Sequence, residues 1–252
     1  MTLLKTDLSG KTALITGASS GIGRGVAKAF AECGAKVVIN YPTSAESDSA
    51  NEVAKEIGPN AVIACADVAR EEEVTSMIDF VLGELGQIDI LVNNAGIARS
   101  APVENIPTSD WNDIFSIHVN GTFFCTRAVL SHMYERDSGR IINTASQLAY
   151  KGAPGFAHYT AAKGAILSFT RSLALEIGDR NISANCVAPG ATMTPILEDV
   201  PENVLNDIRA GIPRGKLAKV DDIVGSYVFL ASDASGHIRG QCISPNGGDV
   251  FL

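Results

Sequence analysis

An alternation of short β-branched runs with longer amphipathic segments constrains the fold of this chain most strongly. The runs cover residues 12–16, 36–40, 61–64, 88–92, 140–144, 182–187 and 241–244, and the helical patterns cover residues 22–33, 45–57, 71–85, 109–135, 157–178 and 221–231. Such alternation is typical of a parallel sheet with helices on both faces. We therefore expect an α/β fold: a doubly wound parallel sheet of Rossmann type, in three αβα layers, that binds ligands beyond the carboxyl ends of its strands.

Composition and charge narrow the class of protein further. No linker or low-complexity segment divides the 252 residues, so we expect a single domain over residues 1–252. The net charge is −8, with no long basic stretch, which argues against nucleic acid as a partner. The N-terminal residues lack a signal-peptide core, and no run of about 18 apolar residues suggests a membrane span, so we expect a soluble, cytoplasmic protein.

Cysteines and histidines give no sign of a metal site. The five cysteines form no CxxC pair, and we expect them to be small buried side chains in a reducing compartment. The four histidines show no HExxH or similar spacing. We expect no bound metal.

A glycine-rich segment, TGASSGIG, follows the first β-run and precedes a helical pattern. Glycines let a backbone turn sharply and approach a pyrophosphate, and a helix N-terminus offers free N–H groups and partial positive charge. A strand before and a helix after make this combination typical of a dinucleotide-binding loop rather than of a tight turn without a ligand. The candidate contacts are Gly17, Ser19, Ser20, Gly21, Ile22 and Gly23.

The end of the second β-run indicates which dinucleotide binds. The acidic residue that usually holds a ribose 2′-hydroxyl is missing there. Hydroxyl groups of Tyr41, Thr43 or Ser44 could donate to a 2′-phosphate, although no Arg or Lys in the stretch would neutralise it. The pattern favours NADP(H) over NAD(H) and leaves dual use open.

Three further residues point to acid–base chemistry. Ser146 follows the fifth β-run, and Tyr159 and Lys163 lie at positions i and i+4 of a helical pattern, on one face. A nearby ammonium favours phenolate, and we expect Lys163 to lower the pKa of Tyr159 by about 1–3 units. Tyr159 would then serve as general acid/base while the Ser146 hydroxyl holds the substrate oxygen.

Taken together with Asn93-Asn94-Ala95-Gly96 and Pro189-Gly190, these motifs resemble a compact short-chain dehydrogenase/reductase from about residue 8 to residue 250. The resemblance implies that Lys163 also binds the nicotinamide ribose and that Asn120 holds a water in the proton relay, although Asn120-Gly121 could also mark an ordinary helix kink. It implies further cofactor contacts from Asp67, Val68, Asn94, Gly96, Pro189, Gly190, Thr192 and Thr194. Asp67 alone would be interpreted as a helix cap, Asn94 and Gly96 as a strand-end turn, and the threonines as loop caps.

The expected function is that of an NAD(P)(H)-dependent oxidoreductase that interconverts a ketone and a secondary alcohol by hydride transfer. Within the family, the chain is similar both to β-ketoacyl-acyl-carrier-protein reductases and to sugar dehydrogenases such as glucose 1-dehydrogenase. Alternatives are a dinucleotide sensor without turnover and a lyase or epimerase on the same fold. Residues 147–156 and a loop over residues 191–211 are the expected substrate walls. The apolar pattern of residues 157–178 predicts a homo-oligomer, and the resemblance implies a tetramer.

Overall fold

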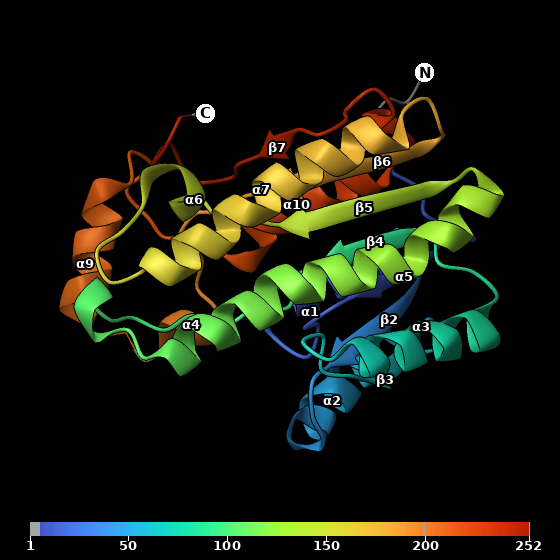
Figure 1. The fold of residues 1–252 in the computed structure, drawn as a ribbon, viewed down its shortest axis with the longest axis horizontal. Coiled ribbons are helices and arrows are strands. Elements are labelled where there is room, and N and C mark those ends of the chain that lie inside the picture. Colours follow the sequence, from blue (N-terminus) through green and yellow to red (C-terminus); the bar gives the residue numbers. More distant parts are fainter. Residues whose placement is uncertain (1–5, 199, 252) are drawn as a thin grey trace.

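The computed structural model describes residues 6–198 and 200–251 and contains a seven-stranded parallel sheet with the strand order β3-β2-β1-β4-β5-β6-β7 (Figure 1). The strands are β1 (Thr12–Ile15), β2 (Lys36–Tyr41), β3 (Ala61–Cys65), β4 (Ile90–Asn93), β5 (Gly139–Thr144), β6 (Ile182–Val187) and β7 (Cys242–Ile243). Every neighbouring pair is parallel. The doubly wound sheet expected from the sequence is confirmed.

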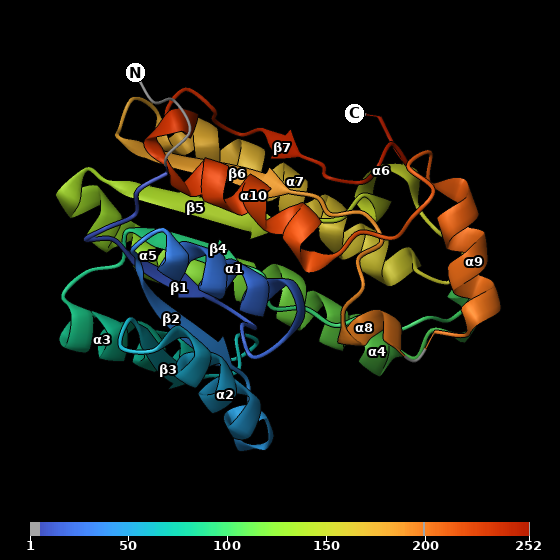
Figure 2. The ribbon, with the colours of Figure 1, turned by 180° about the vertical axis from the view of Figure 1, so that it is seen from behind.

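Helices cover both faces of the sheet. They are α1 (Gly21–Glu32), α2 (Ser47–Ile57), α3 (Glu71–Leu85), α4 (Thr108–Phe115), α5 (Gly121–Arg136), α6 (Leu148–Lys151), α7 (Ala157–Ile177), α8 (Pro195–Glu198), α9 (Glu202–Gly211) and α10 (Val220–Ala231). Helices α3, α5 and α7 lie on the face seen in Figure 1, and α1, α2 and α10 on the face seen in Figure 2. The result is the three-layer αβα arrangement.

Two apolar cores, one on each face, hold these layers together. Ala13 and Ile15 of β1 join the core with α1, α2 and α10, whereas Leu14, between them, joins the core with α3, α5 and α7. Successive side chains of a strand point to opposite faces, so an uninterrupted apolar run such as TALI fills both cores at once. This burial on two sides explains why the β-runs carry so few polar residues.

The strand order reverses between β1 and β4. The chain runs outward from β1 through β2 to β3, then returns to place β4 on the other side of β1. In open α/β sheets, ligands bind at such a switch point, outside the carboxyl ends of the strands. We call this side of the sheet the carboxyl edge.

The structure departs from the sequence-based expectation in three places. The helix expected over residues 109–135 is split into α4 and α5 by a π-helical turn, Ser116–Asn120. The expected loop over residues 191–211 contains α8 and α9. The prediction that all five cysteines are buried is wrong: Cys125 and Cys186 are buried, Cys33 and Cys242 are partly exposed, and Cys65 is exposed. Among the described residues, no helix has the length and apolarity needed to cross a membrane.

Candidate active site

The ends of β1 and β4 are hydrogen-bonded to each other at the carboxyl edge. The Thr16 hydroxyl accepts the backbone N–H groups of Asn94 (2.9 Å) and Ala95 (3.0 Å). The Asn94 carboxamide donates to the carbonyl oxygens of Thr16 (3.0 Å) and Gly17 (3.1 Å). Asn94 therefore fixes the position of the glycine-rich loop at the switch point.

The glycine-rich loop has the shape of a phosphate cradle. Gly17 and Gly21 adopt φ values of +60° and +55°, which favour glycine. A methyl group on Gly23 would lie 2.3 Å from the Gly17 carbonyl oxygen, so no side chain fits where α1 begins. Ser20, the residue before α1, makes no side-chain cap. The loop and the uncapped helix N-terminus thus fit an anionic pyrophosphate.

The expected adenosine contacts lie beyond β2 and β3. Tyr41 ends β2 and is buried, and Ser44 begins a short 3₁₀ turn after it. Val68 is buried against Gly121, where a methyl group on Gly121 would come within 2.8 Å of it. The Asp67 carboxylate accepts the N–H of Ala69 (2.9 Å) in the turn before α3, whose N-cap residue is Arg70, so Asp67 is not the helix cap that it would be interpreted as alone.

A carboxylate overlooked by the sequence analysis also reaches the glycine-rich loop. The Ser19 hydroxyl donates to Glu46 Oε2 (2.7 Å), and Glu46 closes the 3₁₀ turn that follows Tyr41. The sequence-based prediction that the acidic residue near the ribose is missing considered only the end of β2. The turn after β2 brings Glu46 back to the loop, so negative charge is present there.

The segment after β6 lies against the glycine-rich loop. A methyl group on Gly21 would be 3.6 Å from the Thr194 side chain. The hydroxyls of Thr192 and Thr194 donate within the segment, to the carbonyls of Gly190 (2.8 Å) and Thr192 (3.3 Å). Gln147 N–H donates to the Pro189 carbonyl (3.1 Å), which joins this segment to the loop that carries Ser146.

Ser146, Tyr159 and Lys163 come together beyond the end of β5. Lys163 is buried, and its Nζ donates to the Thr144 carbonyl (2.6 Å) and lies 5.7 Å from the centre of the Tyr159 ring. The Ser146 hydroxyl accepts the Leu148 N–H (3.1 Å) and also hydrogen-bonds to Tyr159. A phenol, a hydroxyl and an amine therefore form one cluster at the carboxyl edge.

The expected acidification of Tyr159 by Lys163 is wrong for this chain. Burial raises the pKa of Tyr159, and the hydrogen bond with Ser146 opposes this only in part. Burial also lowers the pKa of Lys163 to about 7, which weakens its positive charge near neutrality. The ammonium group is directed at the Thr144 carbonyl rather than at the phenol. Tyr159 is thus held as a neutral phenol.

The relay role that the resemblance implies for Asn120 stays a prediction. Asn120 ends the π-helical turn and is exposed, whereas His118, two positions earlier, is buried and faces Tyr159 edge-on at a ring-centre distance of 5.4 Å. Positions two apart in a helix point to nearly opposite sides, so both side chains cannot face the site. His118 is a site residue that sequence reasoning missed, because its spacing depends on the π turn.

His118 is fixed through one nitrogen and leaves the other free within the described part of the chain. Its Nε2 lies 2.8 Å from the Ile97 carbonyl oxygen and 3.0 Å from the Ile97 nitrogen, while buried Nδ1 has no partner there. Burial, and then the charge of Lys163, lower the pKa of His118 well below its usual range. The ring also packs on Gly96, where a methyl group would come within 2.4 Å of it.

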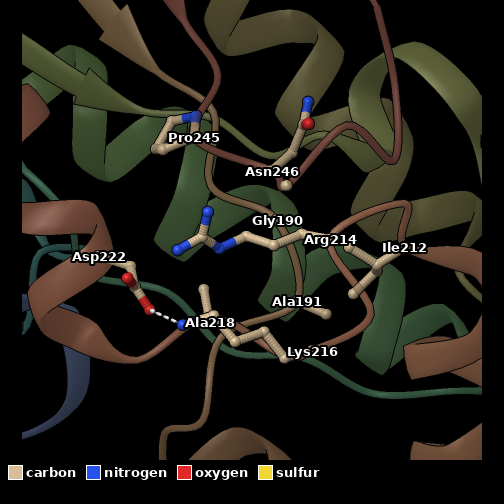
Figure 3. Close-up of a pocket in the computed structure, with 10 residues that line it drawn as sticks. Gly190, Ala191, Ile212, Arg214, Lys216, Ala218, Asp222, Pro245 and Asn246 are labelled. Carbon is tan, nitrogen blue, oxygen red and sulfur yellow. Dashed lines mark ion pairs between the residues drawn. The ribbon is translucent and has the colours of Figure 1, made fainter.

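A cavity of about 330 Å³ lies behind the Pro189–Gly190 turn (Figure 3). Arg214 reaches across it, and Lys216 pairs with Asp222 at 3.8 Å. None of the expected catalytic residues lines this cavity, whereas Gly190, one of the expected cofactor contacts, does. In the part of the chain that the structure describes, no cluster of three His, Cys, Asp or Glu side chains could hold a metal ion.

Comparisons with known proteins agree with this geometry. Residues 17–249 match the family model described as enoyl-(acyl carrier protein) reductase. The chain is 39% identical to the (2S)-[(R)-hydroxy(phenyl)methyl]succinyl-CoA dehydrogenase subunit BbsD of Thauera aromatica (96% of this chain, 97% of the relative). It is also 39% identical to a 3-oxoacyl-[acyl-carrier-protein] reductase of Synechocystis (98% and 100%).

A solved structure extends the similarity to three dimensions. A gluconate 5-dehydrogenase of Burkholderia cenocepacia, crystallised with NADP and tartrate, superposes with a TM-score of 0.93 at 34% identity and 98% coverage of both chains. The matches span the glycine-rich loop, the switch point and the Ser146–Tyr159–Lys163 pocket. The chain belongs to the short-chain dehydrogenase/reductase family and is an NAD(P)-dependent oxidoreductase.

Proposed function

We propose that residues 1–252 form one catalytic domain that interconverts a ketone and a secondary alcohol, with Tyr159 as general acid/base. One observation carries the proposal: the Tyr159 phenol, the Ser146 hydroxyl and the Lys163 amine are clustered at the carboxyl edge of the sheet that also carries the glycine-rich loop. Acid–base catalysis needs the proton donor within hydrogen-bond reach of the reacting oxygen, and this is the place where a substrate beside a nicotinamide would lie.

Each side chain of this cluster has its own role in the reaction. A bound nicotinamide supplies or accepts the hydride. In the reducing direction Tyr159 gives its proton to the substrate oxygen, and its raised pKa keeps it protonated for that role. Ser146 donates a hydrogen bond to the same oxygen as charge develops on it. Lys163, held by the Thr144 carbonyl, binds the ribose hydroxyls, and neutral His118 fixes the Tyr159 ring from the side.

The dinucleotide would be held along the carboxyl edge by the residues already described. Its pyrophosphate would be held by Gly17, Ser19, Ser20, Gly21, Ile22 and Gly23, and its adenosine by Tyr41, Ser44, Asp67 and Val68. Its nicotinamide would be held by Asn94, Gly96, Pro189, Gly190, Thr192 and Thr194. The uncapped N-terminus of α1 and the glycines that exclude side chains support this placement.

NADP(H) is the proposed preference over NAD(H). The relative from Burkholderia was crystallised with NADP, and hydroxyl groups of Tyr41 and Ser44 follow β2 here. Glu46 works against a 2′-phosphate if its carboxylate stays near Ser19. Tyr41→Asp adds a negative charge at the end of β2, so the ratio of kcat/KM for NADPH to that for NADH should fall. An unchanged ratio would show that this position does not contact the ribose.

The substrate is a small molecule, and its class follows from the relatives. Their names include a 3-oxoacyl-[acyl-carrier-protein] reductase and a gluconate 5-dehydrogenase. We propose a ketone that carries an anionic group or a thioester, bound between residues 147–156 and residues 191–211.

Absorbance at 340 nm with NADPH or NADH and a panel containing acetoacetyl-CoA and 5-keto-D-gluconate tests this function. Oxidation of the cofactor by at least one ketone is expected. Product formed without net change of the cofactor would indicate an epimerase or lyase. Tight dinucleotide binding without any turnover would indicate a sensor.

Two further proposals concern the setting of the enzyme. We propose a homo-oligomer, a tetramer by family resemblance, because Leu175 of α7 is 83% exposed and Phe123 of α5 is 41% exposed. These two helices lie on the same face of the sheet (Figure 1). Sedimentation velocity would show the assembly, and a monomer at micromolar concentration would contradict it. We also propose a cytoplasmic location, as the sequence predicts.

A further inference from the structure

Two cysteines that lie far apart in the sequence face each other in the sheet. Cys186 of β6 and Cys242 of β7 are Cα partners in the register of these parallel strands. Neighbouring strands lie about 4.7–4.9 Å apart, and residues in register point to the same face. A disulfide needs a Cα–Cα distance of about 4.4–6.8 Å. The two backbones are therefore already at disulfide distance.

The two thiols differ in their hydrogen-bond partners and in exposure. Cys186 is buried, and its Sγ donates to the Thr170 hydroxyl (3.1 Å). Cys242 is partly exposed, on the short edge strand. Hydrogen bonds from Cys186 and from the Tyr150 phenol lower the pKa of Cys242 against the effect of burial, and the pKa of Cys186 is raised in turn. The accessible member of the pair is thus the better nucleophile.

This pair is connected to the proposed active site. Cys186 lies close enough to Lys163 for its charge to raise the pKa of that lysine. The Thr170 hydroxyl also accepts the Asn143 carboxamide (2.8 Å), whose oxygen accepts Asn93 of β4 (2.8 Å). A chain of hydrogen bonds therefore runs from Cys186 beneath the site to the strand at the switch point. A new covalent bond at Cys186 would break the hydrogen bond between Cys186 and Thr170, which is the first in this chain.

We propose that Cys186 and Cys242 form a reversible disulfide in the presence of a hydroperoxide and that this bond lowers turnover. The Cys242 thiolate attacks one peroxide oxygen, the O–O bond breaks, and the hydroxide released takes up a proton as water. The Cys186 sulfur then attacks the Cys242 sulfenic sulfur, the S–O bond breaks, and the Cys186 proton leaves with that oxygen as a second water. Two thiols and one H₂O₂ give one disulfide and two waters.

When Cys186 is in a disulfide it has no S–H group, so it can no longer donate a hydrogen bond to the Thr170 hydroxyl. The free energy of one such hydrogen bond corresponds to about a twofold to tenfold change in a rate. We therefore expect kcat to fall by about that factor. The chemical step does not depend on the proposed function; only its effect on turnover does. The cross-link can therefore be measured separately from activity.

The test treats the purified full chain with H₂O₂ and maps its peptides by mass spectrometry without reduction. A Cys186–Cys242 peptide pair, lost on treatment with dithiothreitol, is expected whether or not turnover is detected. Cys242→Ser and Cys186→Ala should abolish this pair and the peroxide sensitivity of turnover, whereas the matched control Cys65→Ser should keep both. Oxidation of Cys242 to sulfinic acid with no cross-link in the unmodified chain would overturn the proposal. Equal peroxide sensitivity of the Cys242→Ser enzyme would overturn the regulatory part.

Discussion

Gly23→Ala should weaken dinucleotide binding because the loop has no room for a methyl group. That group would lie 2.3 Å from the Gly17 carbonyl oxygen and 2.6 Å from Asn94 Nδ2. Neither atom is free to move, since Asn94 Nδ2 already donates to the carbonyls of Thr16 (3.0 Å) and Gly17 (3.1 Å). Overpacking of this kind costs about 1–3 kcal/mol, and each 1.4 kcal/mol is about tenfold in affinity.

We therefore expect the Kd for NADPH of the Gly23→Ala protein to rise by about fivefold to 140-fold, measured by quenching of protein fluorescence or by calorimetry. Gly83→Ala is the matched control, because Gly83 lies in α3, is exposed and has no heavy atom within 4 Å of an added methyl group. There, alanine should stabilise the helix by about 0.5–1 kcal/mol and leave the Kd unchanged. Wild-type affinity in the Gly23→Ala protein would refute the assignment of this loop to the cofactor.

Three other changes probe the site and its scaffold. Burial lowers the pKa of Lys163 to about 7, so between pH 7 and 9.5 Lys163 should hold fewer protons in the folded state than in the unfolded state. The destabilisation of the folded state by a charged, buried Lys163 should therefore fade as pH rises. The difference in urea midpoint between wild type and Lys163→Met should shift in favour of wild type over this range, and a constant difference would contradict the low pKa. His118→Phe removes the hydrogen bond to Ile97 and should lower kcat more than it changes KM. His118→Asn should restore part of the lost kcat. Equal kcat and KM in the wild type and both variants would show that the His118 ring only fills space. Arg136→Met removes the ion-pair partner of the buried Asp89 carboxylate at 2.7 Å and leaves it only the hydrogen bonds from Thr12 N–H and the Gln87 amide. The change should cost about 2 kcal/mol of unfolding free energy without altering NADPH binding, which a denaturation series would check.

The layers of the fold and the main site residues could be predicted because they depend on local patterns. Apolar runs such as residues 12–16 mark strands that are buried on both faces, and glycines before a helix mark a phosphate loop. Ser146, Tyr159 and Lys163 were found because a strand end and one helical turn bring them together. Each of these inferences needs only the regular geometry of a single element.

The parts that escaped prediction depend on irregular geometry or on long-range packing. The π turn places His118, not Asn120, against Tyr159. The turn after β2 returns Glu46 to Ser19, and the strand order makes Cys186 and Cys242 neighbours. The direction of the Tyr159 pKa shift depends on burial and on where Lys163 points, and neither can be derived from an i, i+4 spacing.

The proton held by Tyr159 is the centre of the proposed mechanism, and Tyr159→Phe tests it most directly, since it removes one oxygen and leaves the ring beside His118. With a ketone that the wild-type enzyme reduces, we expect kcat followed at 340 nm to fall at least about 10²-fold, while the Kd for NADPH stays within about twofold. Turnover at the wild-type rate in the Tyr159→Phe enzyme would contradict the mechanism.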